Sequence, residues 1–109
     1  MPFTLLNNNG VIMQTVKLVE LYEKKSSSSS FSTYGLREIF INPEYVVFMR
    51  PDAKAPALLV EGKLPEGLEP ATQFTRLQIS RGSHGSEVTV VGSLETVSRK
   101  FDTREVLRG

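Results

Sequence analysis

The chain has 109 residues, of which 39% are hydrophobic and 23% charged, a composition that fits one globular domain and argues against a disordered chain. Thirteen basic and twelve acidic residues leave a net charge of +1, so charge alone gives no reason to expect a nucleic-acid or membrane surface. There is no cysteine, which excludes disulfides, thiolate metal sites and cysteine nucleophiles.

Two segments near the N-terminus are expected to be strands. Residues 3–6 form a short apolar run that ends at the turn-forming residues 7–10, which predicts a terminal strand or a flexible arm. Residues 11–25 are rich in β-branched and aromatic side chains, which favours a strand, and a helix remains the alternative. The five serines of residues 26–30 cannot bury enough apolar area to offset their ordering entropy, so a mobile loop is expected over residues 25–35.

The next segment predicts two strands joined by a sharp reversal. Residues 36–41 and 44–50 are apolar runs with only Asn42 and Pro43 between them. Proline fixes φ and lacks an amide donor while asparagine favours turns, so this dipeptide predicts a turn or kink.

The second of these strands has two apolar faces if its side chains alternate strictly. One face then carries Tyr45, Val47 and Met49, and the other carries Val46 and Phe48. A small open sheet rarely buries both faces. We therefore expect either a sheet curled into a barrel with a covered outer face, or a second copy of the chain over this strand.

Residues 51–72 are expected to form a second mobile loop. Four of the six prolines lie here, with Gly62 and Gly67 between them, and such a stretch cannot form a regular central strand. Because long structureless loops are uncommon in compact domains, we expect a short extended segment at residues 58–60.

The clearest alternation in the chain predicts a β-hairpin over residues 74–92. Leu77 and Ile79 alternate with polar residues before the glycine-containing turn, and Val88 and Val90 do so after it.

A short C-terminal helix is expected after the hairpin. Ser93 is a suitable N-cap residue, and Glu95 suits the positive end of the helix dipole. Leu94, Val97 and Phe101 recur at helical spacing, so one face of the helix should pack on the sheet. Together these elements predict an all-β or mainly β fold in a single domain over residues 1–109, with its core between about residues 11 and 102.

The residues offer little for catalysis or cofactor binding. The one histidine, His84, lies in the hairpin turn, where an ordinary exposed residue is favoured over a ligand contact. The loop carboxylates lack calcium-loop spacing and are expected to be solvated: Asp52, Glu61, Glu66 and Glu69. We therefore expect no catalytic residue, no metal and no cofactor. Four aromatic residues are expected in the core: Phe40, Tyr45, Phe48 and Phe101.

The fourth of the five core strands ends in residues 79–82, Ile-Ser-Arg-Gly, ahead of an apolar fifth strand. Residues 16–92 resemble the Sm-like family in three features. These are this turn, the sharp reversal between the second and third strands, and the long excursion after the third strand. The whole chain is similar to Sm-like members of cyanophage type from marine environmental sequence. A secondary similarity, carried by residues 40–44 (Phe-Ile-Asn-Pro-Glu), is to FlbD-type flagellar proteins.

The Sm-like resemblance implies a strongly bent, five-stranded antiparallel barrel of Sm-like or SH3-like type that forms a homo-oligomeric ring by pairing edge strands. It also implies a site for single-stranded RNA at the Arg-Gly turn, here Arg81 and Gly82. Asn42 on the corresponding loop and His84 beside the turn are further candidate contacts. The family's partner motif, Asp-x-x-Met-Asn, is absent.

Two functions from different classes follow as hypotheses. The first is a non-enzymatic, ring-forming protein that binds single-stranded RNA. The second is a structural or assembly module of a phage, which acts through contacts with phage or host proteins and which the near-neutral charge favours. For both we expect a cytoplasmic or intravirion location without a membrane, because no export signal and no apolar run of membrane-span length is visible.

Overall fold

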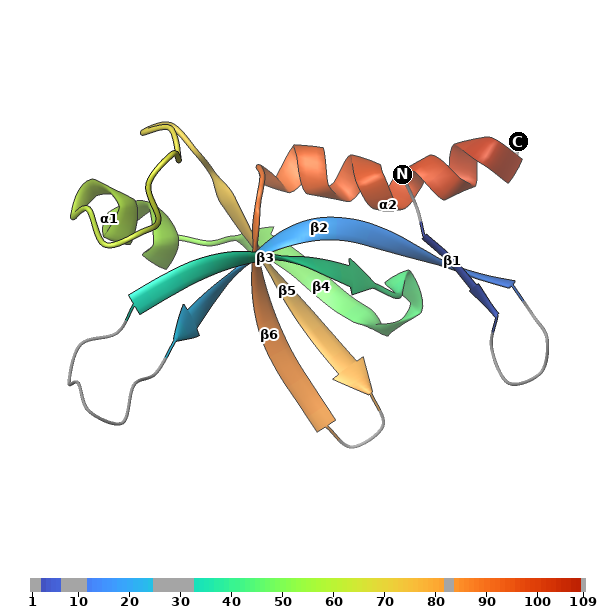
Figure 1. Ribbon diagram of the computed structural model, residues 1–109. Helices are drawn as coiled ribbons and strands as arrows, with labels where there is room; N and C mark the ends of the chain where they lie inside the picture. Colours follow the sequence, from blue (N-terminus) through green and yellow to red (C-terminus); the bar gives the residue numbers. More distant parts are fainter. Residues whose placement is uncertain (1–2, 7–11, 25–32, 82–83, 109) are drawn as a thin grey trace.

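The computed structural model describes the backbone of residues 3–6, 12–24, 33–81 and 84–108, and the side chains of residues 15–24, 33–80 and 85–102. The fold is mainly β (Figure 1). Its elements are, in chain order, β1 (Phe3–Leu6), β2 (Ile12–Lys24), β3 (Thr33–Ile41), the 3₁₀ helix η1 (Pro43–Tyr45), β4 (Val46–Pro51), α1 (Lys54–Val60), β5 (Phe74–Arg81), β6 (His84–Val91) and α2 (Leu94–Arg108). The predicted mainly β fold with five core strands and a C-terminal helix is confirmed by β2 to β6 and α2.

The strands form one antiparallel sheet in the order β3-β2-β6-β5-β4, to which β1 adds by pairing with β2. Residues 11–25, for which a strand was favoured over a helix, contain the long strand β2. The predicted terminal strand at residues 3–6 is β1. β3 and β4 are the two ends of the five-strand order, yet they are consecutive in the chain through η1. The sheet therefore curls strongly, as a small bent β domain requires.

The main core lies inside the curled sheet. Its buried residues come from four strands and one helix: Val16, Leu18, Ile41, Leu77, Val90 and Val97. Half-buried residues from β3 to β6 and from α2 pack around them: Ile39, Val46, Met49, Ile79, Val88 and Phe101. Leu77 and Ile79 of β5 and Val88 and Val90 of β6 point inward, as the period of two predicts.

α2 confirms the predicted C-terminal helix and its buried face. The Ser93 hydroxyl accepts a hydrogen bond from the amide of Thr96 at 3.1 Å, which caps the first turn. Val97 is fully buried and Phe101 packs against the main core. α2 packs against β4 and β5 and runs across one side of the sheet (Figure 1), so it closes one side of the core.

The expectation of an extended segment at residues 58–60 is wrong, because these residues lie in α1. Pro56 is in the first turn of this helix, where the amide that proline lacks would have no partner within the helix. Gly62, with φ of 74°, follows α1 and donates its amide to the carbonyl of Leu59 at 3.1 Å, which is a typical helix ending. The prolines correctly excluded a strand, but they did not exclude a helix.

α1 covers a second, smaller apolar cluster. Its buried residues are Leu21, Ala55, Leu64 and Phe74. Phe74 and Leu77 are three residues apart on β5 and therefore lie on opposite faces of that strand. The second cluster thus lies on the outer face of the sheet, where α1 and the segment after it form a partial cover.

β4 does not have the two faces that strict alternation predicts. A bulge between Val46 and Phe48 interrupts its pairing with β5. The bulge adds one residue to β4, so Val46 and Met49 both pack into the main core although they are three residues apart. Tyr45, Val47 and Phe48 are left 41%, 60% and 40% exposed. In the single chain, therefore, nothing among the described residues fully covers the outward side of this strand.

Candidate functional site

The candidate RNA-binding residues lie toward one end of the β4–β5 ladder. Arg81 ends β5 and pairs with His84, the first residue of β6, while Gly82 and the side chains of Arg81 and His84 lie outside the described residues. The first residue of β4 pairs with Ile79, two residues before Arg81. Asn42, which precedes η1 and β4, therefore approaches the same end of the ladder as Arg81.

Asn42 caps η1 and keeps one donor unused. Its Oδ1 accepts a hydrogen bond from the amide of Glu44 at 3.0 Å, and its backbone carbonyl accepts one from the amide of Tyr45 at 3.0 Å. The Nδ2 group is buried and has no hydrogen-bond partner among the described residues. A buried donor without an acceptor costs about 1–3 kcal/mol, so the Asn42 side chain is an unsatisfied polar group at this point of the fold.

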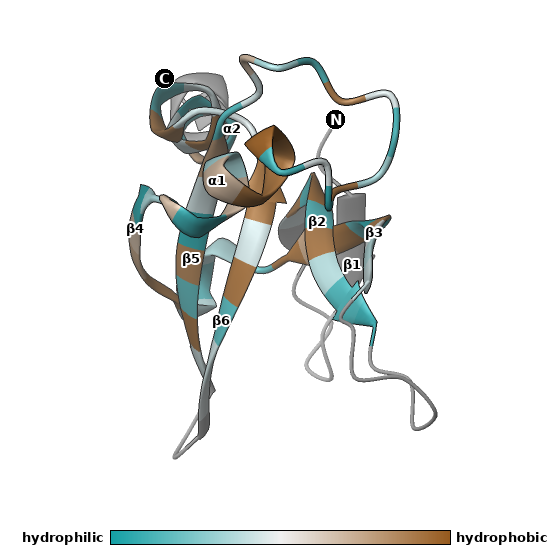
Figure 2. Ribbon diagram, turned by 90° about the vertical axis from the view of Figure 1, so that its left-hand side faces the viewer, coloured by the Kyte–Doolittle hydropathy of each residue, from teal (hydrophilic) through white to brown (hydrophobic). Residues whose placement is uncertain are grey.

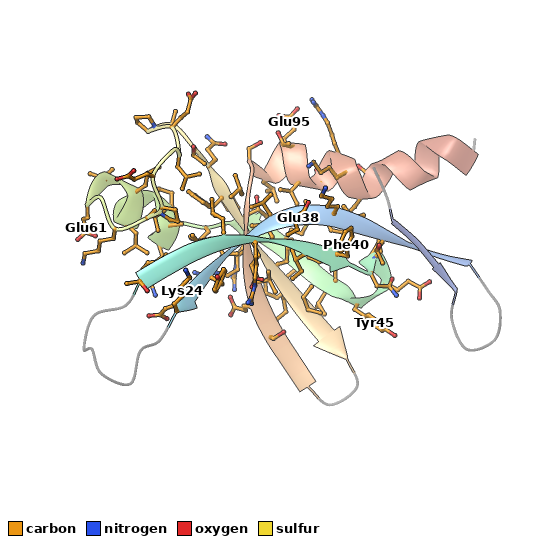
Figure 3. The ribbon with its side chains drawn as sticks, in the orientation of Figure 1. Lys24, Glu38, Phe40, Tyr45, Glu61 and Glu95 are labelled. Atoms are coloured by element: carbon orange, nitrogen blue, oxygen red, sulfur yellow. The ribbon has the colours of Figure 1, made fainter. Side chains whose placement is uncertain are left out.

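Exposed apolar side chains follow η1 and β4 and continue onto β3. We call Phe40, Tyr45, Val47 and Phe48 the edge surface, because they lie on the two end strands of the sheet and on η1, which connects these strands. Figure 3 shows Phe40 and Tyr45 on the side of the molecule where η1 joins β3 to β4. The guanidinium of Arg50 lies 4.7 Å from the centre of the Phe48 ring and adds a cation to this surface.

The edge surface corrects the prediction that four aromatic residues belong to the core. Phe101 does pack against the main core, but Phe40, Tyr45 and Phe48 are 40% or more exposed. Phe40 pairs with Lys17 on the outer face of β2 and β3, and the bulge turns Phe48 outward. Alternation predicted which residues share a face, but it could not predict which face remains uncovered.

A hollow of about 360 Å³ lies where β2 separates from β6, next to α1. Its lining includes four acidic residues, two basic residues and two tyrosines: Glu20, Glu23, Asp52, Glu87, Lys54, Arg76, Tyr22 and Tyr34. The size is at the lower end of the range for small-ligand pockets. Its charged groups make it a polar hollow, suited to a charged or hydrogen-bonding ligand.

Asp52 and Arg76 form the base of this hollow. The Asp52 Oδ1 atom accepts hydrogen bonds from the Arg76 Nη2 and Nε atoms at 2.6 and 3.1 Å. The other carboxylate oxygen accepts a bond from the amide of Ala55 at 2.8 Å, at the start of α1. Arg76 Nε also lies 3.2 Å from a carboxylate oxygen of Glu87. One arginine thus connects the start of α1 to β5 and β6.

The prediction that Asp52 is a solvated loop residue is wrong, because only 6% of the residue is exposed. The other three loop carboxylates, Glu61, Glu66 and Glu69, are exposed as expected. An aspartate just before Ala-Lys-Ala-Pro is a signal for a helix start, and it could have predicted the capping role of Asp52. Its partner Arg76 is 24 residues away along the chain, and no local pattern connects the two.

The rim of the hollow is ordered by contacts across β2 and β3. Gly35 lies opposite Tyr22, and a Cβ atom at Gly35 would come within 2.9 Å of the Tyr22 ring, so the ring lies over the glycine backbone. The Arg37 guanidinium stacks 4.1 Å from the centre of that ring and donates to Glu20 at 2.8 Å. The hydrogen bond to Glu20 raises the pKa of Arg37, which therefore stays charged at any physiological pH.

Two further kinds of site are absent from the described residues, a metal site and a membrane-spanning helix. Among the described residues, no three metal-binding side chains come together in a way that could hold an ion. None of the helices they form combines the length and the apolarity needed to cross a bilayer.

The chain matches no family model, no curated protein and no solved structure. Its function must therefore be inferred from its own geometry and from the sequence resemblance stated above.

Proposed function

We propose that this protein is a non-enzymatic protein that forms a closed homo-oligomeric ring, in which β4 of one copy pairs with β3 of the next. The observation that carries the proposal is the edge surface. Val47 is 60% exposed on a strand whose neighbours Val46 and Met49 belong to the main core. An exposed apolar strand at a sheet edge is prone to pair with another chain, and the proposed ring would cover it.

A second copy of the chain fits this surface because the two sheet ends differ. β3 and β4 are the ends of the sheet order, and within the described part of the chain each has one edge without a strand ladder, where a further strand can pair. When β4 of one copy pairs with β3 of the next, the assembly still has one free β3 edge and one free β4 edge. The contact therefore repeats, and it closes into a ring if the rotation between copies allows. Phe40 on β3 and Phe48 on β4 lie beside these edges and would be covered together.

Replacing Val47 by arginine is expected to reduce the mass of the particle in solution to that of the 12.1-kDa chain. The charged guanidinium would have to lose its water at an apolar contact, which strongly disfavours association. Because Val47 is 60% exposed, the change should alter the free energy of unfolding by no more than about 0.5 kcal/mol. Light scattering after size-exclusion chromatography measures the mass.

Val60→Arg is the matched control, since Val60 is an 86% exposed valine on α1, outside the edge surface. This variant should keep the mass of the wild type. A wild-type protein of 12.1 kDa at every concentration tested, or a Val47→Arg variant that retains the oligomeric mass, would contradict the proposed ring.

Single-stranded RNA is the second candidate ligand, and the end of the β4–β5 ladder favours it. The register brings Asn42 and Arg81 toward that end, and the Asn42 Nδ2 donor has no partner among the described residues. An arginine can pair with phosphate and stack on bases, and Arg81 would be the main RNA contact. A ring would repeat this pair of residues once per copy.

Arg81→Ala is expected to weaken binding of a fluorescein-labelled oligouridine at low salt by about tenfold or more, as loss of an arginine contact does. Fluorescence anisotropy measures the affinity. Arg99→Ala removes an exposed arginine of α2 that pairs with Glu95, and it should leave the affinity unchanged. If both variants lost affinity equally, the binding would be due to non-specific charge and not to a site at Arg81. No binding at high micromolar protein would refute the RNA proposal.

A phage structural or assembly module remains the alternative use of the same ring, with loops presented to phage or host proteins. The net charge of +1 favours it over nucleic-acid binding. Co-purification of phage structural proteins with the particle would support this alternative. Recovery of RNA with the particle would support the RNA proposal instead.

A further inference from the structure

The sheet has a split between β2 and β6. The two strands pair only through Glu20 with Val90 and Leu21 with Thr89. Beyond these pairs, β2 continues to Lys24 against β3, and β6 extends back to His84 against β5. Each strand therefore has one paired edge and, within the described residues, one edge without a ladder that faces the split. Figure 2 shows β6 and β2 diverging below α1.

The sequence supplies a reason for the split. If the β2–β6 register continued by two residues, Glu23 would lie directly opposite Glu87. Like charges directly opposite each other on neighbouring strands are destabilising. Glu87 is instead held by Arg76, with 3.2 Å between the Nε and carboxylate oxygen atoms. The strands thus separate where continued pairing would bring two carboxylates together.

The hollow described above occupies this split. Both Glu23 and Glu87 line it, and its lining holds four acidic against two basic side chains. Arg76 is already paired with the buried carboxylate of Asp52 at 2.6 Å, and Glu20 is paired with Arg37, which lies outside the lining. Setting these pairs aside leaves Glu23 and Glu87 against Lys54. The electrostatic balance of the hollow is therefore negative, and it favours a positively charged occupant.

We propose that the split binds a short extended peptide segment of a partner protein that carries a lysine or arginine. The peptide backbone would pair with the free edges of β2 and β6, in the manner of strand addition to a sheet. Its basic side chain would meet Glu23 and Glu87 in the hollow. This site is separate from the edge surface, so the inference goes beyond the proposed ring and does not depend on it.

Fluorescence anisotropy of a Thr-Val-Lys-Val-Thr-amide peptide with fluorescein on its N-terminal amine tests the proposal on the full chain. The wild type should bind it, and a peptide with glutamate in place of lysine should bind more than about tenfold more weakly, because like charges would then meet. The variant Glu23→Lys should bind the lysine peptide more weakly by a similar factor. Its introduced ammonium group can pair with Glu87, so that the β2–β6 ladder extends into the split. Glu66→Lys is the matched control, because Glu66 is an exposed glutamate outside the hollow.

Hydrogen exchange supplies a readout that does not depend on affinity. The amides of residues 22–24 and 86–88 should become protected in the wild type when the peptide is added, and in Glu23→Lys without it. Absence of wild-type binding up to about 1 mM peptide, equal affinity for the lysine and glutamate peptides, or protection elsewhere in the chain would overturn the proposal. The comparison of the two peptides uses only the wild type, so it holds even if a variant folds poorly.

Discussion

Leu77→Ala is expected to destabilise the protein by about 3 kcal/mol, because a leucine fully buried in a core leaves a cavity when it is truncated. Leu77 has 0% exposure at the centre of β5, where it pairs with Met49 on β4 and Val88 on β6. Its side chain therefore links the two neighbouring strands through the main core. For a domain of this size the melting temperature should fall by roughly 10–20 °C.

Urea unfolding followed by circular dichroism measures this loss. Leu77→Met nearly conserves the side-chain volume and should cost less than about 1.5 kcal/mol. Val60→Ala on the exposed face of α1 should change stability by less than about 0.5 kcal/mol. If Leu77→Ala were no more destabilising than Val60→Ala, the inward direction of alternate β5 residues would be wrong.

Asp52→Ala is expected to destabilise the protein by about 3 kcal/mol, since removing one partner of a buried ion pair leaves the other groups unsatisfied. Only 2% of the Asp52 side chain is exposed, against 32% of the Arg76 side chain. The Ala55 amide at the start of α1 would lose its acceptor, and it is buried. Arg76 would keep Glu87 and partial solvation, which limits the loss on its side.

Two further variants separate the charge from the hydrogen bond. Asp52→Asn keeps an oxygen that can accept a hydrogen bond from the Ala55 amide but removes the charge that faces Arg76. Its free energy of unfolding should therefore lie between those of the wild type and Asp52→Ala. The double variant Asp52→Ala with Arg76→Met should be less destabilised than the sum of the single changes, because the two residues contact each other. Strict additivity in urea unfolding would contradict the coupling.

The strands of this protein can be predicted from the local alternation of apolar and polar residues, because side chains point to alternate faces wherever the backbone is extended. Leu77 and Ile79, with Val88 and Val90, predicted the β5–β6 hairpin, and the structure confirms it. Ser93 and the spacing of Val97 and Phe101 predicted the start and buried face of α2 in the same way. Each of these signals lies within a few residues of the feature that it predicts.

The candidate sites were less accessible to sequence reasoning. The resemblance indicated Arg81 and Gly82, with Asn42 and His84 as further candidates. Among these four, the structure describes side-chain hydrogen bonding for Asn42 alone. The hollow was not predicted, because its residues come from β2, β3, β5, β6 and the start of α1. Neither Glu23 nor Glu87 is unusual in the sequence, and only the β2–β6 register relates them.

Local sequence pattern was sufficient for the mainly β class, the order of the five core strands along the chain and the C-terminal helix, because backbone geometry links each to neighbouring residues. The bulge in β4, the helix at residues 54–60 and the burial of Asp52 against Arg76 became visible only in the folded chain. These features arise from contacts between segments distant in the chain. A bulge is set by the strand that it pairs with, a short helix by the apolar cluster that it covers, and a buried charge by the partner that compensates for its lost water.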